Sequence, residues 1–393
     1  MTNHSTEGQR IAYIGCWYNR DMYSHNCSNL VESLRRCGAN IDVVTSNCRC
    51  FSSATKFDIS VDELINQHCA GVAIPHAPAN PGRKHGRMKF LAVRMLRIDL
   101  WLAIARGFLY YRKSSFARTV HYDQVLEAFG VVPLYVLAML ASLSHKRLFV
   151  TVHEVDPFQR RHAWVNKLYD RCERVIVYSE DMKRGLIGLG VKPERITVTK
   201  YSAEFYDIAQ SPRTKYIYFG GHNILRGKGY TELLDALKSL QAKGVNIQLV
   251  LYVGHGCNGL EEAREMARRA GVDGMIEWSE FFTGPDLAKA YQACKACIIP
   301  YTHGSARHAL TTAMTNGTPV IATRHIDIPE YLGNHGIYID GSADSIADAI
   351  CNIENKTIDT EALGIELRKL AAEDLDVGKV AVRLCDIYAG QAS

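Results

Sequence analysis

The chain has 393 residues, and its 46 Lys and Arg against 41 Asp and Glu give a formal net charge of +5. Hydrophobic residues make up 47% and charged residues 22%, which excludes a chain that is disordered throughout, because disorder needs low hydrophobicity and high net charge. The small excess of positive charge argues against nucleic acid as a partner. At about 150 residues per domain, the length favours two or three domains.

Apolar runs that suit buried strands alternate along the chain with segments of helical periodicity. Residues 10–15, 28–37 and 40–45 are predicted as strand, helix and strand, and such a βαβ unit requires parallel strands. Further strands are predicted at 124–129, 147–152, 174–178, 196–199, 216–219, 247–253, 275–278, 296–299 and 319–322. Further helices are predicted at 133–143, 230–242, 261–270, 286–293, 309–316 and 345–354.

The stretch from 201 to 215 has neither helical nor strand periodicity and contains Ser211-Pro212, so we predict an interdomain linker there. The predicted fold class is α/β, with two Rossmann-like, doubly wound parallel-sheet domains of similar size that face a central cleft. Ligands of such sheets bind at the carboxyl ends of the strands. The loops that follow the strands are therefore the first candidates for a site.

Cysteine use and hydropathy indicate the compartment. The chain has 12 cysteines, and residues 1–10 lack the apolar segment of a secretory signal, so we expect reduced thiols and a cytoplasmic protein. Cys48-x-Cys50 and Cys294-x-x-Cys297 are predicted to be buried or incidental thiols, although the second spacing would allow a metal or redox site. No transmembrane helix is predicted, because residues 90–111 carry several charges and residues 131–143 are too short.

The strongest chemical signal is the glycine-rich segment Gly220-Gly221-His222-Asn223-Ile224-Leu225-Arg226-Gly227-Lys228-Gly229-Tyr230, which joins a predicted strand to a predicted helix. Glycine lets a backbone approach a ligand closely, and a helix N-terminus carries partial positive charge. With Arg226 and Lys228 beside it, this turn is predicted to bind a mono- or diphosphate. The spacing is not that of a P-loop, and a flexible, solvated turn is the alternative.

A second segment that could bind a ligand follows the predicted strand at 296–299. Its small residues would let backbone N–H groups point at a ligand, its arginine adds a cation, and its threonines offer hydroxyls to a ribose. Taken alone, such a segment is also typical of a generic βαβ unit. The donor-binding candidates in this segment are Gly304, Ser305, Ala306, Arg307 and Thr312.

Together, and in their order, the motifs resemble those of GT-B fold glycosyltransferases, most of all the large family 4 group. The turn from Gly221 to Gly229 and the leucine-rich helix after it resemble the G-R-…-K-G turn of that family. The segment from Ala313 to Thr323 resembles its E-A-M-…-G-x-P-V-I-A-T motif. In the first half, Thr151-Val152-His153-Glu154 resembles its T-V-H-[DE] strand end. The resemblance extends over nearly the whole chain.

This resemblance implies a retaining glycosyltransferase that needs no metal or other cofactor and moves a sugar from a nucleotide-sugar donor to a glycan, lipid-linked or small-molecule acceptor. It implies an acceptor-binding domain at 1–205, a donor-binding domain at 206–375, and a C-terminal helix at 376–393 that packs back on the first domain. Arg226 and Lys228 match the catalytic basic pair on the donor diphosphate, where they would neutralise charge on the leaving group. The donor-binding residues implied in this turn are Gly221, His222, Arg226 and Lys228.

The sequence departs from the family at two positions. The family has two glutamates eight positions apart around the second segment, and Gly304 and Thr312 stand there. The first glutamate normally contacts the donor sugar and the second the ribose, so the donor, the activity and the retaining outcome stay open. Arg307 and His308 could compensate, and a cationic Arg307 would favour an anionic donor sugar. The alternative is a catalytically degenerate GT-B protein that acts as a binding or regulatory subunit.

His153 is the catalytic candidate in the first domain, because it ends a predicted buried strand. The resemblance implies that it supports the donor sugar, whereas in an inverting enzyme a His or a carboxylate would deprotonate the acceptor. A His that is satisfied within a packed turn is the other interpretation. Aromatic residues in the loop after the first strand suit stacking on a sugar, or packing in the core. Glu154 and Asp156 are alternatives to His153. The acceptor-binding candidates are Trp17, Tyr18 and Glu154, and weaker candidates nearby are His121, Asp123 and Glu127.

The basic stretch from Arg83 to Lys113 interleaves cations with apolar residues. It would suit a membrane surface that presents a lipid-linked acceptor. Its charges do not gather on one helical face, so a solvated and partly buried segment is the alternative. We expect a cytoplasmic enzyme with peripheral contact to the inner face of the membrane. A two-domain enzyme that uses NAD is disfavoured, because no G-x-G-x-x-G follows the first strand.

Overall fold

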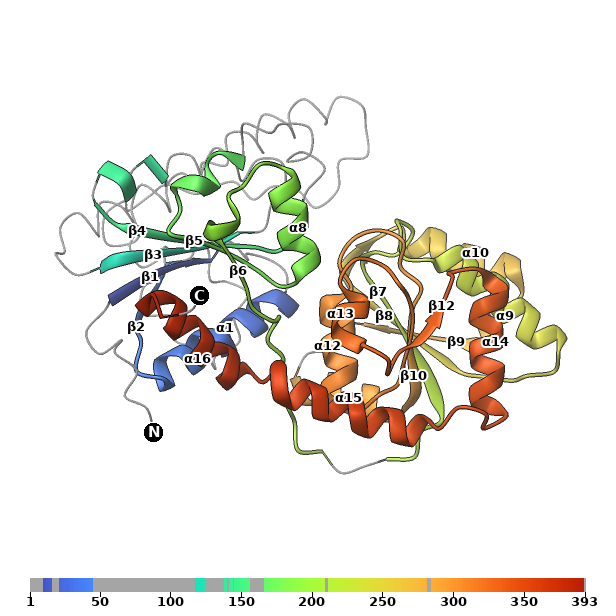
Figure 1. Ribbon diagram of the computed structural model, residues 1–393. Coiled ribbons are helices and arrows are strands. Elements are labelled where there is room, and N and C mark those ends of the chain that lie inside the picture. Colours follow the sequence, from blue (N-terminus) through green and yellow to red (C-terminus); the bar gives the residue numbers. More distant parts are fainter. Residues whose placement is uncertain are drawn as a thin grey trace, which may run out of the picture. The chain divides into compact units, whose positions relative to one another are not determined.

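The structure is a computed structural model (Figure 1), and it describes residues 10–15, 21–44, 117–124, 138–139, 141–143, 145–155, 166–208, 211–280 and 284–391. The chain divides into two compact units. Unit 1 consists of Met1–Lys200 with Val377–Ser393, and unit 2 consists of Tyr201–Asp376. Each unit contains a six-stranded sheet in which all neighbouring strands are parallel. This confirms the predicted α/β class with two doubly wound, Rossmann-like sheets.

The sheet of unit 1 has the strand order β2-β1-β3-β4-β5-β6. Its strands are β1 (Arg10–Gly15), β2 (Asn40–Val44), β3 (Ala117–Gln124), β4 (Arg147–Val152), β5 (Arg174–Val177) and β6 (Ile196–Val198). The α-helices described in this unit include α1 (Asp21–Arg36), α8 (Glu180–Gly188) and α16 (Val377–Ala389). The chain adds β2 on one side of β1 and β3 on the other, so the strand order reverses between β1 and β3. Ligands of open α/β sheets bind at such a reversal.

The strand beside β1 differs from the predicted one. The prediction placed it at 124–129, whereas β3 spans Ala117–Gln124, and residues 125–129 lie outside the described part of the chain. Polar residues alternate along β3, and His121 and Asp123 are buried. Each has a hydrogen-bond partner at or just after the end of β4, and each has a second partner, on α16 for His121 and on β1 for Asp123. A buried strand whose polar side chains are satisfied in this way carries no apolar run, so a search for such runs misses it.

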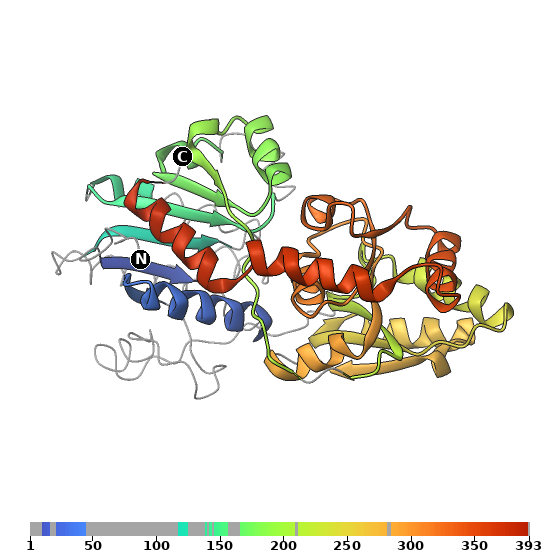
Figure 2. The same ribbon diagram turned by 60° about the horizontal axis from the view of Figure 1, so that its bottom comes forward.

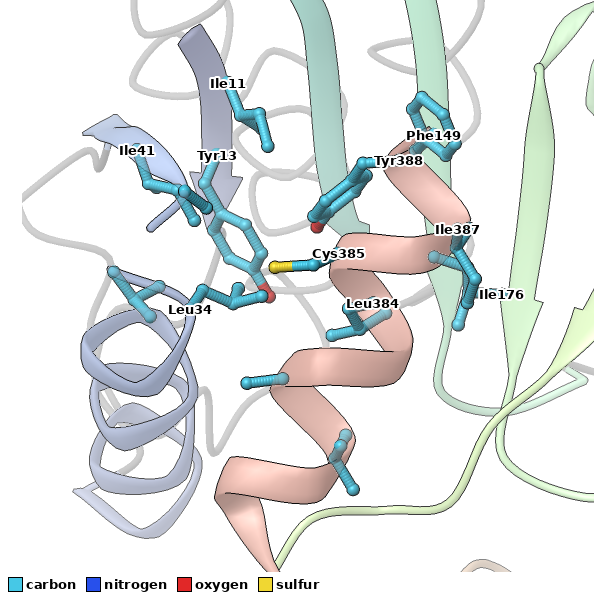
Figure 3. Close-up of a cluster of buried hydrophobic side chains, with 14 residues drawn as sticks. Ile11, Tyr13, Leu34, Ile41, Phe149, Ile176, Leu384, Cys385, Ile387 and Tyr388 are labelled. Atoms are coloured by element: carbon cyan, nitrogen blue, oxygen red, sulfur yellow. The ribbon is translucent and has the colours of Figure 1, made fainter. Parts of the chain in front are cut away.

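Helix α16 packs beside α1 in unit 1, on the same side of the sheet (Figures 1 and 2). Figure 3 shows Leu384, Cys385 and Tyr388 of α16 within one cluster of buried side chains from α1 and the sheet. The ring of Tyr388 meets that of Phe149 edge-on, with centroids 5.2 Å apart, and Arg147 Nη1 donates to Tyr388 O over 2.7 Å. Fully burying one large apolar side chain contributes roughly 1.5–3 kcal/mol. The last helix is therefore part of the core of unit 1.

The sheet of unit 2 has the strand order β12-β11-β10-β7-β8-β9, which reverses between β7 and β10. Its strands are β7 (Lys215–Asn223), β8 (Leu249–Asn258), β9 (Ile276–Glu280), β10 (Cys294–Ile299), β11 (Val320–Thr323) and β12 (Ile337–Ile339). Its α-helices are α9 (Tyr230–Ala242), α10 (Leu260–Ala270), α11 (Gly284–Gln292), α12 (Arg307–Thr315), α13 (Ile328–Leu332), α14 (Ala343–Glu354) and α15 (Thr360–Asp374) within the described ranges. Helices α9 and α14 pack against each other (Figure 1). The glycine-rich segment singled out in the sequence begins within β7 and continues to the start of α9, and the second segment follows β10. β7 and β10 are the two strands at the reversal.

Candidate functional site

The turn after β7 and the loop after β10 form one structural element in unit 2. The carbonyl oxygen of Gly227 accepts hydrogen bonds from the backbone N–H groups of Thr302, over 3.0 Å, and His303, over 3.1 Å. Two segments more than 70 positions apart in the sequence are thereby joined at the strand reversal. We use the name basic turn for residues 224–229 and the name partner loop for residues 300–306.

Two glycines allow this close approach. Gly227 has φ +66° and Gly229 has φ +68°, a region that L side chains rarely adopt. A Cβ atom on Gly227 would overlap the side chain of His303, and one on Gly229 would overlap the carbonyl oxygen of Pro300. Both positions therefore require glycine for two separate reasons, the backbone angle and the lack of space.

The two cations of the basic turn, Arg226 and Lys228, differ in their contacts and in their exposure to solvent. Lys228 Nζ lies 3.7 Å from the centroid of the Tyr301 ring, and its backbone oxygen accepts from the hydroxyl of Tyr218 over 3.2 Å. The Tyr301 hydroxyl in turn donates to the carbonyl oxygen of Phe219. Arg226 is exposed. One cation is thus held on an aromatic ring of the partner loop, and the other projects toward solvent.

Helix α9 begins at the end of the basic turn. Its N-cap residue is Gly229, which has no side chain to cap the first backbone N–H groups. Such N–H groups, together with the helix dipole, favour an anion. The basic turn therefore combines a helix N-terminus with two cations, which is suited to a phosphate or diphosphate. Gly221, at φ +63° near the end of β7, bends this strand at a register shift.

The partner loop and helix α12 contain the remaining predicted donor-binding residues. Gly304 has φ +75° and is exposed, with open space where a Cβ atom would stand. A glutamate would fit there, but it would strain the left-handed backbone. Ser305 Oγ accepts from the backbone N–H of Arg307 over 3.2 Å, and Ala306 is the N-cap residue of α12. Thr312 is half-buried farther along this helix.

Arg307 requires a correction. The sequence predicted a cation that meets the donor sugar, but Arg307 Nη1 lies 2.5 Å from Asp327 Oδ2, and the two side chains are 5% and 1% exposed. Its charge is therefore balanced inside unit 2 by a residue that precedes α13. The spacing of residues along a loop and helix does not show which way a side chain turns, and Asp327 lies 20 positions away.

In unit 1, a hydrogen-bonded cluster lies at the reversal between β1 and β3. His153 Nε2 lies 2.5 Å from Asp123 Oδ1, and Asp123 Oδ2 accepts from the Tyr13 hydroxyl over 2.8 Å. The Tyr178 hydroxyl lies 3.4 Å from the same Nε2 atom. We call Tyr13, Asp123, His153 and Tyr178 the His153 cluster. The sequence analysis predicted Asp123 only as a weaker candidate and did not predict Tyr13 or Tyr178. Hydrogen bonds between residues of different strands leave no local pattern in the amino-acid sequence.

His121 lies in β3, two residues before Asp123, and contacts β4, but it is a structural residue. Its Nε2 atom lies 2.8 Å from Thr151 Oγ1, and its Nδ1 atom is hydrogen-bonded to the Tyr388 hydroxyl of α16. Burial lowers the pKa of His121 to about 4, His153 adds to this effect, and the Asp123 charge opposes it. The ring is therefore neutral at pH 7 and links the sheet to the last helix.

Several predicted residues cannot be placed in this geometry. Glu154 is exposed directly after His153. Trp17, Tyr18, Asp156, the pair Cys48 and Cys50, and the basic stretch from Arg83 to Lys113 lie outside the described residues, as does the side chain of His222. Of the predicted residues, the structure brings Lys228 onto Tyr301 of the partner loop and His153 onto Asp123.

The described ranges contain no group of three or more His, Cys, Asp and Glu side chains that could hold a metal ion. They also contain no helix long and apolar enough to cross a membrane. Cys294 and Cys297 are buried free thiols in β10. Burial raises the pKa of Cys294 to about 12, so this thiol is protonated at pH 7.

Two family models match the chain. The model described as "Glycosyl transferases group 1" matches residues 213–356, and the model described as "Glycosyltransferase Family 4" matches residues 27–200. The chain belongs to the family 4-like glycosyltransferases. This confirms the family that the order of motifs predicted.

Curated relatives of this family 4-like glycosyltransferase carry one shared description. The D-inositol 3-phosphate glycosyltransferase of Pseudarthrobacter chlorophenolicus is 23% identical over 235 residues, which are 56% of this chain and 55% of the relative. The D-inositol 3-phosphate glycosyltransferase of Corynebacterium kroppenstedtii is 26% identical over 233 residues, which are 53% of this chain and 51% of the relative. The chain spans about half the length of the curated relatives it matches.

Solved structures with the GT-B architecture match the family 4-like chain over nearly its whole length. Sucrose-phosphate synthase from Thermosynechococcus elongatus matches with a TM-score of 0.73 at 17% identity, covering 97% of this chain and 98% of that one. Anabaena HepE in complex with UDP and glucose matches with a TM-score of 0.68 at 15% identity, covering 97% and 100%. At these identities the likeness shows the fold, and it confirms the predicted GT-B class.

Proposed function

We propose that the protein is a glycosyltransferase in which unit 2 holds a nucleotide-sugar donor and unit 1 holds the acceptor. The basic turn is the observation that supports this proposal most. It lies at the strand reversal of unit 2, where Arg226, Lys228 and the N-terminus of α9 together suit a diphosphate. The HepE structures, which contain UDP or UDP-glucose, make uridine nucleotides the first candidates.

The proposed reaction joins an acceptor oxygen to the anomeric carbon of the donor sugar while the bond from that carbon to the diphosphate breaks. Negative charge then grows on the departing nucleoside diphosphate. Arg226 and Lys228 would stabilise this charge, since preorganised cations stabilise developing charge well. In this proposal two protein cations take the place of a metal ion, and the retaining outcome follows the family resemblance. The acceptor is proposed to be a glycan, a lipid-linked sugar or a small molecule.

Nucleotide binding tests the donor site directly. We would measure UDP, GDP, ADP and dTDP affinities of the full chain by calorimetry, then repeat the best ligand with Arg226→Ala/Lys228→Ala. Loss of two charge-assisted contacts should weaken binding by about 3 kcal/mol, roughly a hundredfold. Lys238→Ala is the matched control, because Lys238 is an exposed cation in α9, the helix that follows the basic turn. Equal affinity of the double variant and the wild type would contradict the proposal.

A binding or regulatory protein is the second candidate function. It is favoured by Gly304 and Thr312, which replace the family glutamates, and by the enclosed pair Arg307 and Asp327. Incubation of the isolated protein with the best-binding nucleotide sugar would separate the two candidates. Release of free nucleoside diphosphate, absent in the Arg226→Ala/Lys228→Ala variant, would exclude the degenerate protein.

An inverting enzyme is the remaining alternative for the chemistry. It is favoured by the pairing of His153 with Asp123, because a His held by a carboxylate suits proton abstraction from a hydroxyl. The anomeric configuration of the sugar in the product, read by NMR against that of the donor, decides between retention and inversion.

A further inference from the structure

The side chain of His303, in the partner loop, lies directly against Gly227, the residue between the two cations of the basic turn. The backbone N–H of His303 donates to Gly227 O over 3.1 Å. A Cβ atom built on Gly227 would lie only 3.1 Å from His303 Cγ. Since Arg226 and Lys228 are the neighbours of Gly227 in the chain, a third basic side chain reaches the basic turn from the partner loop.

The His303 ring has one hydrogen-bond partner among the described residues. Its Nδ1 atom lies 3.1 Å from Thr302 Oγ1, and the residue is exposed, so a ligand can reach the ring. A hydroxyl can either donate or accept. Thr302 can therefore donate to Nδ1 of a neutral ring that carries its proton on Nε2, and a protonated ring carries a proton on both nitrogens. In both of these forms the Nε2–H group can donate to a ligand.

The basic groups at this place have no acidic partner of the kind found elsewhere in the partner loop region. Arg307, directly after the loop, is paired with the Asp327 carboxylate inside unit 2. Neither Arg226 nor His303 forms an ion pair with a carboxylate in the described part of the chain. Nitrogen donors that gather without a counter-charge suit an anion that accepts several hydrogen bonds, and a phosphate group has this chemistry.

We propose that His303 is a further donor-binding residue, whose Nε2–H group donates a hydrogen bond to the diphosphate at the basic turn. The nucleotide and the sugar transfer in this inference rest on the proposed function. The contact between His303 and a diphosphate anion rests on the position of the ring beside Gly227. In the transfer reaction the same hydrogen bond would help Arg226 and Lys228 to stabilise the departing nucleoside diphosphate.

Two ligands test this contact on the full chain, inorganic pyrophosphate followed by ³¹P NMR and UDP followed by calorimetry. His303→Phe keeps an aromatic ring that can pack on Gly227 but has no N–H group. We expect both ligands to bind about tenfold more weakly to this variant, because one charge-assisted hydrogen bond is lost. The urea midpoint should stay unchanged, since the residue is exposed.

Two further variants separate a hydrogen bond from a role in packing. His303→Gln can still donate from its side-chain amide and should bind both ligands within about threefold of the wild type. His335→Phe is the matched control. His335 lies two residues before β12 (Ile337–Ile339), hence at the amino edge of the parallel sheet, whereas the partner loop follows the carboxyl end of β10. This control should bind within about twofold of the wild type.

The outcomes distinguish the inference from the proposed function. Equal affinity of His303→Phe and the wild type would overturn the inference, while a loss of UDP binding in Arg226→Ala/Lys228→Ala would keep the function. Weaker pyrophosphate binding by His303→Phe, in a protein that binds none of UDP, GDP, ADP and dTDP, would support the inference and contradict the function. A wild type that binds neither pyrophosphate nor a nucleotide would overturn both.

Discussion

Lys228 Nζ lies 3.7 Å from the ring centroid of Tyr301, so the cation of the basic turn rests on an aromatic side chain of the partner loop. Tyr301 is held at its side chain and at its main chain, because its hydroxyl donates to Phe219 O and its backbone oxygen accepts from Thr323 Oγ1 over 2.6 Å. A cation near an aromatic face gains roughly 0.5–2 kcal/mol. The position of the Lys228 charge is thereby set by a residue 73 positions away in the sequence.

Replacing the aromatic ring under Lys228 should weaken nucleotide binding. In Tyr301→Leu the lysine loses its platform, and we expect the affinity for the best nucleoside diphosphate to fall by about 1 kcal/mol, roughly fivefold. Tyr301→Phe is the control, because it keeps the ring and removes only the hydroxyl that donates to Phe219 O. Calorimetry should find the Phe variant within twofold of the wild type. A Leu variant that binds as tightly as the Phe variant would exclude a role for the ring.

A methyl group at Gly229 should disrupt unit 2. Gly229→Ala brings a Cβ atom onto the carbonyl oxygen of Pro300 at φ +68°, whereas Gly244→Ala, just beyond the other end of α9, adds one in open space at φ +73°. Both variants carry about 1 kcal/mol of backbone strain. We expect denaturant unfolding to show a further loss of at least about 2 kcal/mol in the Gly229 variant alone. Equal losses of unfolding free energy in the two variants would show that the partner loop can move away from the added methyl group at little cost.

The two arginines near the candidate donor site should behave in opposite ways. Arg307→Ala leaves the buried Asp327 carboxylate without its arginine, which should cost about 3–5 kcal/mol of stability. Arg226→Ala removes an exposed side chain, so stability should change by less than about 0.5 kcal/mol while nucleotide affinity falls. Thermal unfolding and calorimetry on both variants check this contrast. A stable Arg307→Ala protein with reduced affinity would restore Arg307 as a donor contact.

Stability should depend on the protonation of His121. Burial lowers its pKa from 6.5 to about 4 in the folded chain, so the unfolded chain binds the proton more tightly. The stabilising effect of the neutral ring is fully present above about pH 6.5, falls as the pH is lowered toward 4, and amounts to on the order of 3 kcal/mol. Urea unfolding at pH 7.5, 6 and 5 measures it. His121→Gln should flatten the pH dependence over this range, and an unchanged slope would place the titration elsewhere.

Local patterns in the sequence were sufficient for the fold class and for the basic turn. Alternating strands and helices identify a parallel sheet because each βαβ connection fixes the direction of the next strand. Gly227, Lys228 and Gly229 stand next to one another in the chain, so their chemistry can be read from consecutive letters. The position of strand β3 was not predicted from apolar runs, because Asp123 and His121 are polar residues that are buried with partners elsewhere in the fold.

Only the tertiary structure decided which charged groups act on which. The sequence by itself determined that Arg226, Lys228 and Arg307 are cations beside glycine-rich loops, but it could not show that Arg307 turns inward to Asp327. It determined that His153 ends a buried strand, but not that Asp123 binds its Nε2 atom. The physical reason is the same in both cases. A hydrogen bond or ion pair depends on distances of a few ångströms between side chains, and the fold of the chain between the two partners sets those distances, over 20 positions for Arg307 and Asp327 and over 30 for Asp123 and His153.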